Sequence, residues 1–292
     1  MTKTIVAIGE ALWDVFPDQR RPGGAPCNVA FHAAQLGDRG VIITRVGGDA
    51  DGDELVAYLR QRGVDTRYMQ RDATRPTGTV VVKLTHISPR YDITNDVAWD
   101  YIAPEDAASG LAAEADAICV GSLAQRSSTT RATIRQLLSD AHGKALIVFD
   151  VNLRPPFTDP EVILTTFVAA DVTKMSASEV AEVSTMLDRP SLAQWLVESV
   201  GVQAVCVTRG EKGASITTSD GTVSVPGIEV DASAGDPVGA GDAFTAAMTC
   251  ALVRQATPEQ ALVTANRYAA LVATKPGAMP VLSAEELAEI GL

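Results

Sequence analysis

The segment "SAGDPVGAGDAF", residues 233–244, places two aspartates among glycines and alanines, directly before a run of residues typical of a helix. Glycine permits backbone conformations that other residues avoid, and it lets a ligand approach the peptide N–H groups closely. A helix start exposes such N–H groups and the positive end of the helix dipole, so the pattern indicates an anion-binding turn, and the carboxylate of Asp242 inside it points to chemistry at this turn. By itself, the pattern also fits a tight turn whose aspartate caps a helix.

A second group of polar residues lies near the N-terminus. The stretch "GEALWDVFP" places Asp14 just beyond the first expected strand, and "RRPGGAPCNVAFHAAQLG" places Gly23 and Gly24 before an amphipathic helix with Asn28 in its first turns. A carboxylate, an amide and bare glycine backbone near the carboxyl ends of strands can bind a ligand that carries several hydroxyl groups. Asp14 and Asn28 also suit ordinary turn and cap positions.

The composition limits the classes of partner. The chain of 292 residues is 46% hydrophobic and 21% charged, which suffices for one large α/β core or two smaller ones. Its net charge of −12 disfavours binding to nucleic acid and to anionic membranes. No apolar run reaches the roughly 18 residues that a membrane span needs, and two early carboxylates argue against a signal peptide. We therefore expect a cytoplasmic protein that binds neither nucleic acid nor membrane.

The cysteines and histidines offer no recognisable reactive pattern. The four cysteines lie far apart without a C-x-x-C spacing, and the three histidines lack identifiable acid or nucleophile partners. We therefore expect buried reduced thiols, and neither a zinc site nor a histidine-based triad.

Short β-branched runs alternate along the chain with segments of helical length. The expected strands cover residues 4–9, 40–46, 116–121, 145–151, 170–175 and 203–209. This alternation predicts a doubly wound α/β fold, a mostly parallel sheet with helices on both faces. Residues 77–86 and 91–102 alternate like exposed strands with no helix between them, so they predict a small antiparallel lid, to which part of 10–22 is a further candidate. We expect a single domain over residues 1–292 that carries this lid.

Nine motifs occur in the order and spacing of one known family. They are "GEALWDVFP", "GGAPCNVAFHAAQLG", "VGGDADG", "VAWDYI", "GSLAQRSSTTRATI", "FDVNLRPP", "VTRGEKGA", "DPVGAGDAF" and "TKPGAMP". Together they make the chain resemble the ribokinase/PfkB family of carbohydrate kinases, and within it the bacterial fructokinases. The resemblance implies a ribokinase-like fold with a small β lid, and an enzyme that binds ATP and a sugar.

The resemblance also assigns a role to the glycine-rich turn. It implies that Gly239, Ala240 and Gly241 hold the transferring phosphate over backbone N–H groups at a helix start. Asp242 would accept the proton of the sugar hydroxyl as that hydroxyl attacks the γ-phosphoryl group. No G-K-[ST] of a Walker loop follows the turn, and the H-R-D and D-F-G signatures of protein kinases are missing from the sequence.

The other site residues that the resemblance implies fall into two groups. The expected sugar-side residues are Asp14, Gly23, Gly24, Asn28, Asp100 and Arg154. The expected nucleotide-side residues are Asn152, Thr208, Gly210, Gly213 and Asn266. The guanidinium of Arg154 is suited to a bidentate grip on substrate or phosphate oxygens, and the alternative for it is a surface salt bridge.

Two departures from the family pattern concern metal ions. The family's N-x-x-E motif, which arranges water around magnesium, is "SASE" here, with Ser176 in the asparagine position and Glu179 retained. We therefore expect Mg²⁺ on the side of Glu179. The stretch "DASAG", residues 231–235, lengthens the approach to the turn, and Pro237 stands where threonine is common. In relatives this region helps to hold a monovalent cation, so K⁺ is a further candidate cofactor.

The resemblance favours phosphorylation of a primary hydroxyl of a ketohexose, D-fructose to fructose 6-phosphate, because of the fructokinase-like strings "GSLAQRS" and "AWDYI". The alternatives are a kinase of the same fold for 2-keto-3-deoxygluconate, ribose or a nucleoside, and a non-catalytic sugar or nucleotide sensor. An intact Asp242 argues against the sensor, which needs no base there. An exposed edge of the lid is a candidate surface for a homodimer.

Overall fold

The computed structural model describes residues 1–83, 90–231, 235 and 238–290. Pro237 and most of the segment 231–235, on which the sequence departs from the family pattern, lie outside the described residues.

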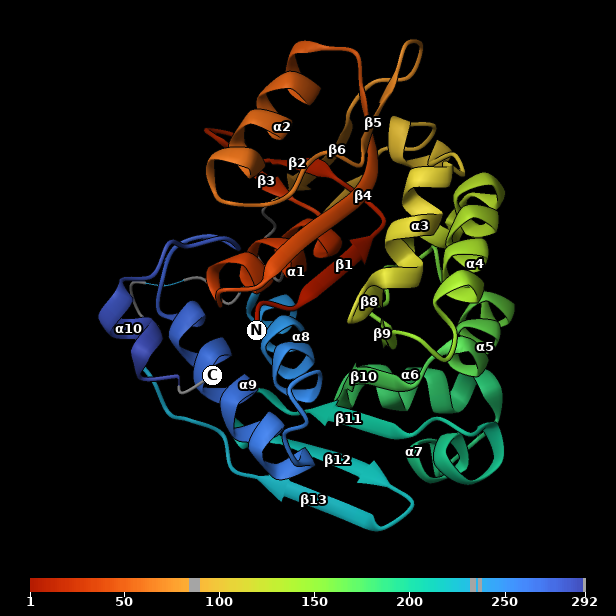
Figure 1. The fold of residues 1–292 in the computed structure, drawn as a ribbon, viewed down its shortest axis with the longest axis vertical. Coiled ribbons are helices and arrows are strands. Elements are labelled where there is room, and N and C mark those ends of the chain that lie inside the picture. The colour runs from red at the N-terminus through yellow and green to blue at the C-terminus, as the bar shows by residue number, and fades with distance from the viewer. Residues whose placement is uncertain (84–89, 232–234, 236–237, 291–292) are drawn as a thin grey trace.

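A large sheet forms the centre of the molecule (Figure 1). Within the described residues it has nine strands in the order β13-β12-β11-β10-β9-β8-β1-β4-β5. Neighbouring strands pair in parallel, except β11 with β12 and β12 with β13, which are antiparallel. The strands are β1 (Thr4–Ile8), β4 (Arg39–Gly47), β5 (Met69–Asp72), β8 (Ala117–Val120), β9 (Leu146–Asp150), β10 (Val172–Ser176), β11 (Ala204–Thr208), β12 (Ala214–Thr218) and β13 (Gly221–Val225). All six expected strands are confirmed, whereas β5 and the hairpin β12–β13 were not predicted.

Helices cover both faces of this sheet, as the doubly wound pattern predicts. One face carries α1 (Ala25–Gln35), α2 (Ala50–Gln61), α8 (Ala240–Leu252), α9 (Pro258–Ala273) and α10 (Ala284–Ala288). The other face carries α3 (Asp106–Glu114), α4 (Ser128–Ala141), α5 (Pro160–Ala169), α6 (Ala177–Leu187) and α7 (Leu192–Trp195), which continues into a π-helical turn, Leu196–Val200. Short 3-10 helices span Ala98–Tyr101, Leu123–Arg126 and Gly210–Lys212.

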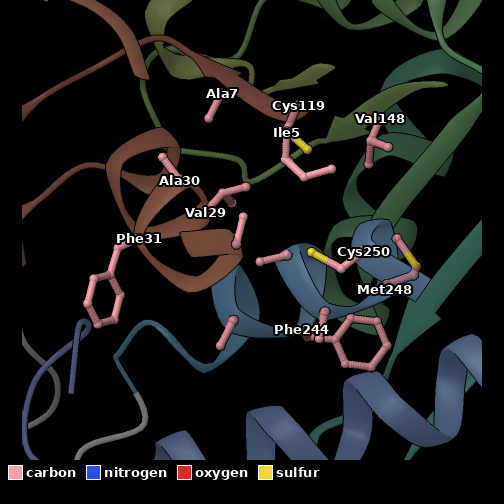
Figure 2. Packing of buried hydrophobic residues seen from close by; sticks show 14 of the residues in the cluster. Ile5, Ala7, Val29, Ala30, Phe31, Cys119, Val148, Phe244, Met248 and Cys250 are labelled. Atoms are coloured by element: carbon pink, nitrogen blue, oxygen red, sulfur yellow. The ribbon is translucent and has the colours of Figure 1, made fainter. Parts of the chain in front are cut away.

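Alternate residues of the strands contribute to two separate hydrophobic cores. In β1, Ile5 and Ala7 pack on the α1 and α8 side, whereas Val6 and Ile8 pack on the opposite side. Figure 2 shows the first of these cores, in which Phe244 and other side chains of α8 lie near residues of α1 and of the central strands. A strand buried on both faces needs apolar residues at every position, which explains the continuous β-branched runs. The first core fixes α1 and α8 against the sheet.

A second, smaller sheet lies beside the main one. Among the described residues it has four strands in the order β3-β2-β6-β7, namely β2 (Leu12–Val15), β3 (Arg20–Gly23), β6 (Gly78–Lys83) and β7 (Arg90–Ile93). These strands come from the three stretches that the sequence pattern indicated for a lid. The prediction of an antiparallel lid is wrong for one pair: β2–β3 and β6–β7 are antiparallel, but β2 and β6 are parallel. Parallel pairing is possible here because a long crossover, which includes β4 and α2, separates β2 from β6 in the chain. In Figure 1 the strands β2, β3 and β6 lie next to α2. On β2, the indole N–H of Trp13 donates to the carbonyl oxygen of Asp51 at 3.0 Å, and Arg20 on β3 forms an ion pair with the Asp51 carboxylate.

The prediction of a strand over residues 91–102 is wrong beyond Ile93. Residues 98–101 form a short 3-10 helix in which Trp99 and Asp100 are buried. The carboxylate of Asp100 accepts the N–H of Val97 at 3.2 Å, an interaction that favours a turn over an extended chain. The apparent alternation of this stretch therefore reflects side chains that pack around a turn.

The described cysteines are free and buried. His32 is also buried, and its two ring nitrogens lie 2.9 Å from the Tyr268 hydroxyl and 2.9 Å from the carbonyl oxygen of Ala278. Burial lowers the pKa of His32 to about 3, so this histidine is a neutral link between α1 and α9. Within the described residues, no group of three acidic, histidine or cysteine side chains could hold a metal ion, and no helix is long and apolar enough to cross a membrane.

Candidate active site

The glycine-rich turn opens helix α8. The helix begins at Ala240, and Gly239 precedes it with φ 82°. This left-handed conformation favours glycine, and a Cβ at position 239 would lie 2.6 Å from the Cα of Ala278. Asp242 therefore lies in the first turn of a 13-residue helix, where backbone N–H groups lack partners within the helix. This location is the one that the sequence pattern predicted.

Asn28 and Asp242 meet between the starts of two helices. The amide Nδ2 of Asn28, on α1, donates to Oδ2 of Asp242 at 2.6 Å. Helix α1 begins at Ala25, and its N-cap Gly24 has φ 104°, which again favours glycine. A Cβ at Gly24 would also collide with the carbonyl oxygen of Glu10. Glycine at position 24 thus lets the helix start close to the end of β1, and the helix then delivers Asn28 to the carboxylate of Asp242.

Three carboxyl groups share this region. Burial is the main cause that raises the pKa of Asp242 to about 6, and the negative charge of Asp150 adds to the effect. Burial also raises the pKa of Asp14 on β2 to about 6 and that of Glu10 to about 7. For all three groups, the positive charge of Arg154 acts in the opposite direction. The fold therefore brings Asp14, Asp242 and Arg154 within electrostatic reach of one another.

Glycine at position 23 makes room for Asp14. The two residues lie on the paired strands β2 and β3, and a Cβ at Gly23 would collide with Oδ2 of Asp14. Gly23 therefore determines where this carboxylate lies, although glycine itself offers no side chain to a ligand.

Glu10, Asp150 and Lys174 were not predicted. Glu10 is 3% exposed, and its Oε2 lacks a hydrogen-bond partner among the described residues. Lys174 and Asp150 form a buried ion pair with an Nζ to Oδ2 distance of 3.0 Å. A signal for all three exists in the sequence, because each is a charged residue within or at the end of an otherwise apolar strand, and such residues are buried only when they have a partner or a function.

Asn152 and Arg154 follow β9. Asn152 has φ 42°, in the left-handed region, and its carbonyl oxygen accepts a hydrogen bond from the Ser122 hydroxyl at 3.4 Å. Arg154 is exposed, and its Nη1 donates to the carbonyl oxygen of Leu153 at 2.9 Å. No salt bridge of Arg154 is present within the described residues, so the alternative of a surface salt bridge lacks a partner there. The guanidinium is thus available to an anionic ligand.

Glu179 is held by the protein on both carboxylate oxygens. Oε1 accepts the backbone N–H of Leu153 at 2.8 Å, and Oε2 accepts the N–H and the hydroxyl of Ser176 at 2.7 and 2.8 Å. Ser176 is the N-cap of α6 and forms a capping box with Glu179, which gives this serine a structural role. Three protein donors leave Glu179 unsuited to direct coordination of a metal ion, but the remaining lone pair of Oε1 can accept water. The arrangement fits Mg²⁺, which keeps several of its waters when proteins bind it.

A hollow of about 420 Å³ lies where β10 and β11 end and α6 begins. Its lining residues are Ser176, Ala177, Ser178, Thr208, Arg209, Gly210 and Lys212. Thr208 and Gly210, two expected nucleotide-side residues, therefore lie together beside the start of a helix. Two cationic side chains, Arg209 and Lys212, were not predicted, and they suit a ligand with phosphate groups.

Gly213 and Asn266 lie at the base of the hairpin β12–β13. Gly213 has φ +88°, and a Cβ there would collide with the carbonyl oxygen of Val225. The amide of Asn266, on α9, donates to the carbonyl oxygen of Pro226 at 3.1 Å. Both residues thus have structural contacts, and neither lines the hollow. Their contact with a nucleotide stays a prediction.

Asp100 pairs with Arg126, and not with the other expected sugar-side residues. Its two carboxylate oxygens accept from Nε and Nη2 of Arg126, each at 2.8 Å. The Arg126 guanidinium lies over the rings of Trp99 and Phe157, 4.0 and 4.6 Å from their centroids. Within the described residues, no hydrogen bond or ion pair joins Asp100 to Asp242. A sugar contact of Asp100 stays a prediction.

Comparisons with known proteins agree with this architecture. Residues 5–285 match the family described as pfkB family carbohydrate kinase. A Pyrococcus horikoshii protein named "Putative sugar kinase PH1459" is 31% identical, with 97% of this chain and 91% of that protein covered. A fructokinase of Vibrio alginolyticus is 32% identical, with 94% of each protein covered.

Solved structures agree as well. The P. horikoshii sugar kinase in complex with ATP has a TM-score of 0.82 at 28% identity, and covers 98% of this chain and 99% of that one. A double mutant of a Vibrio cholerae fructokinase, with fructose, ADP and potassium bound, has a TM-score of 0.83 at 26% identity, over 99% and 98% of the two chains. The sheet, the lid and the glycine-rich helix start thus belong to a known enzyme architecture. The chain is a member of the pfkB family of carbohydrate kinases, an ATP-dependent sugar kinase.

Proposed function

We propose that this kinase transfers the γ-phosphoryl group of ATP to a primary hydroxyl of a ketohexose and converts D-fructose to fructose 6-phosphate. The observation that carries the proposal is the carboxylate of Asp242, which Asn28 holds at 2.6 Å at the N-terminus of α8. The choice of fructose is supported by the relatives named fructokinase, and by the neutral or acidic side chains of Asp14 and Asn28, which suit sugar hydroxyl groups.

In this proposal, each group of residues has one task. Asp14, Asn28 and the backbone at Gly23 and Gly24 orient the sugar. Asp242 accepts the proton of the attacking hydroxyl, for which a pKa of about 6 is well placed at neutral pH. The N–H groups at the start of α8 face the charge that develops on the transferring phosphoryl group.

The proposed nucleotide site is the hollow lined by Thr208 and Gly210. Asn152 is proposed as a further nucleotide-side residue. Bound Mg²⁺ would neutralise charge on the phosphate oxygens, and Glu179 would orient a water of that ion. Potassium is proposed as an activator, supported by the potassium in the V. cholerae fructokinase structure.

The role of Glu179 can be tested by its replacement with glutamine. We expect Glu179→Gln to raise the Mg²⁺ concentration needed for half-maximal rate, while the KM for sugar changes little, because an amide is a weaker acceptor for metal-bound water. The measurement is a Mg²⁺ titration at saturating ATP and sugar. Ser176→Ala is the comparison: it removes a helix cap worth about 1 kcal/mol of stability, but it keeps the carboxylate and the two backbone N–H groups that donate to it. An unchanged Mg²⁺ titration for Glu179→Gln would assign this residue to helix capping alone.

The choice of substrate can be tested with a panel of fructose, ribose, 2-keto-3-deoxygluconate, mannose and adenosine. We expect the highest kcat/KM for fructose, measured as ATP turnover on each compound. A sugar acid is the second candidate, because Arg154 is exposed without a salt bridge in the described residues and can bind a carboxylate. Should the keto-deoxy acid exceed fructose by tenfold or more, and should Arg154→Ala abolish that preference, the sugar-acid kinase replaces the fructokinase.

A further inference from the structure

A buried ion pair lies in the central sheet below the start of α8. Lys174 on β10 and Asp150 at the end of β9 are partners in the strand register. The Nζ of Lys174 lies 3.0 and 3.2 Å from the two carboxylate oxygens of Asp150, and each side chain is 8% exposed. Removing two charges from water is costly, and apolar residues of similar size often stabilise a core equally well. Stability alone therefore does not account for this pair.

The pair lies against the first two turns of α8. The hydroxyl of Thr245 donates to Oδ2 of Asp150 at 2.6 Å, and it also lies 3.0 Å from the carbonyl oxygen of Gly241. On the other side, the Nζ of Lys174 lies near Gly241. A Cβ added at position 241 would lie 3.3 Å from this Nζ. Asp150 is thus joined to the glycine-rich turn through Thr245, and the ammonium group of Lys174 lies next to Gly241.

The same pair contributes opposite charges to the surroundings of Asp242. The charged groups that act on the Asp242 carboxyl come from every element around it: Asp14 of β2, Glu10 after β1, Asp150 of β9, Arg154 after β9 and Lys174 of β10. The charge of Asp150 raises the pKa of Asp242, and the charges of Lys174 and Arg154 lower it. Lys174 also interacts with the charge of Glu179 on the nucleotide side.

We propose that the Lys174–Asp150 ion pair is a positioning unit for phosphoryl transfer: it holds the first turn of α8 in place and balances the charges around Asp242. The inference rests on the proposed role of Asp242 as the base. Neither residue of the pair needs to touch the sugar, because Thr245 and Gly241 connect the pair to the turn.

The test is the pH dependence of kcat/KM in Lys174→Met, in Asp150→Asn and in the double variant. In Lys174→Met the negative charge of Asp150 is uncompensated, which raises the pKa of Asp242. The acid limb, the part of the pH profile where kcat/KM falls as the pH drops, should therefore move to higher pH by on the order of one unit. Loss of the Asp150 charge leaves Lys174 uncompensated, so the limb should move to lower pH. In the double variant the charges cancel again, and the limb should lie close to that of the wild type. Its kcat should still fall by about tenfold to a hundredfold, because the turn loses its support.

A merely structural role would lower the activity of both single variants without moving the two limbs in opposite directions. Lys144→Met is the matched control, since Lys144 is an exposed lysine that donates to the carbonyl oxygen of Asp140, and it should leave both rate and pH profile unchanged. Circular dichroism and thermal melting establish that each variant is folded. If a single variant does not fold, the double variant decides, because it buries no uncompensated charge.

Two results would overturn the inference: acid limbs that stay in place or move together in the folded single variants, or a double variant with the kcat of the wild type. Asp242→Asn separates this failure from a failure of the proposed function. An active Asp242→Asn variant would remove Asp242 as the base, whatever the pH profiles show. If Asp242→Asn is inactive and the acid limbs of the single variants stay in place, only the positioning role of Lys174 and Asp150 is ruled out.

Discussion

Replacing Asp242 with asparagine is expected to lower kcat by about a hundredfold to ten-thousandfold, the usual range for the loss of a general base. The amide fills the same space at the start of α8 but cannot accept the proton of the sugar hydroxyl. Sugar and ATP binding should stay near normal, because the amide oxygen of the new side chain can still accept from Asn28, and the hollow beside Thr208 is unaffected. The measurements are kcat from steady-state ATP turnover and the two dissociation constants from calorimetry.

The same mechanism predicts the pH dependence of the wild type. A base must be unprotonated, so kcat/KM should fall as the pH drops through about 6, the pKa to which burial raises Asp242. Asp220→Asn is the matched control, since it makes the same chemical change at an exposed turn between β12 and β13. If Asp242→Asn keeps more than about half of the wild-type kcat, another group is the base and the assignment of the turn is wrong.

Loss of the Asp14 carboxylate is expected to raise the KM for fructose by about one to two decades. This range corresponds to the roughly 1.5–3 kcal/mol of a hydrogen bond to a charged group. Asp14→Ala removes the carboxylate directly. Gly23→Ala keeps Asp14 but places a Cβ where its Oδ2 now lies, so the carboxylate must move. Both variants should raise the KM for fructose while the KM for ATP stays close to its wild-type value.

Gly110→Ala is the control for the glycine substitution, because a Cβ at position 110, on α3, meets no atom within 4 Å. That variant should bind fructose as the wild type does. Asp14→Ala tests whether the carboxylate is needed, and Gly23→Ala tests whether its position matters. A fructose KM that is unchanged in Asp14→Ala would assign this residue to the structure of the lid, and the sugar would have to be held by other groups.

The sequence alone was informative where structure depends on near neighbours in the chain. Glycines and alanines around Asp242, followed by an apolar run, predicted a helix start, and α8 begins at Ala240. The β-branched runs predicted six of the strands that pair in parallel in the sheet, since a strand buried on both faces must be apolar at successive positions. The order of nine motifs then indicated the family, which residues 5–285 match.

The sequence-based prediction was wrong where the backbone conformation depends on contacts with distant residues. Residues 94–102 alternate like a strand, but the bidentate ion pair of Asp100 with Arg126 and the burial of Trp99 hold residues 98–101 in a 3-10 helix. The partner that decides this conformation lies 26 positions away. The neighbouring residues in the sequence do not indicate such a distant partner. The spacing of the polar residues therefore predicted an exposed strand.

Which residues act together was decided only by the tertiary structure. Asn28 and Asp242 are 214 positions apart, and they meet because α1 and α8 pack on the same face of the sheet and begin at the same place. Lys174 and Asp150 looked like single charges in apolar strands until the pairing of β9 with β10 placed them in register below Gly241. The sequence determined the elements and the chemical groups, because helix starts and strand periodicity are local properties. Contacts between distant elements, and the pKa of each buried carboxyl, exist only after strand order and helix packing have removed these groups from water.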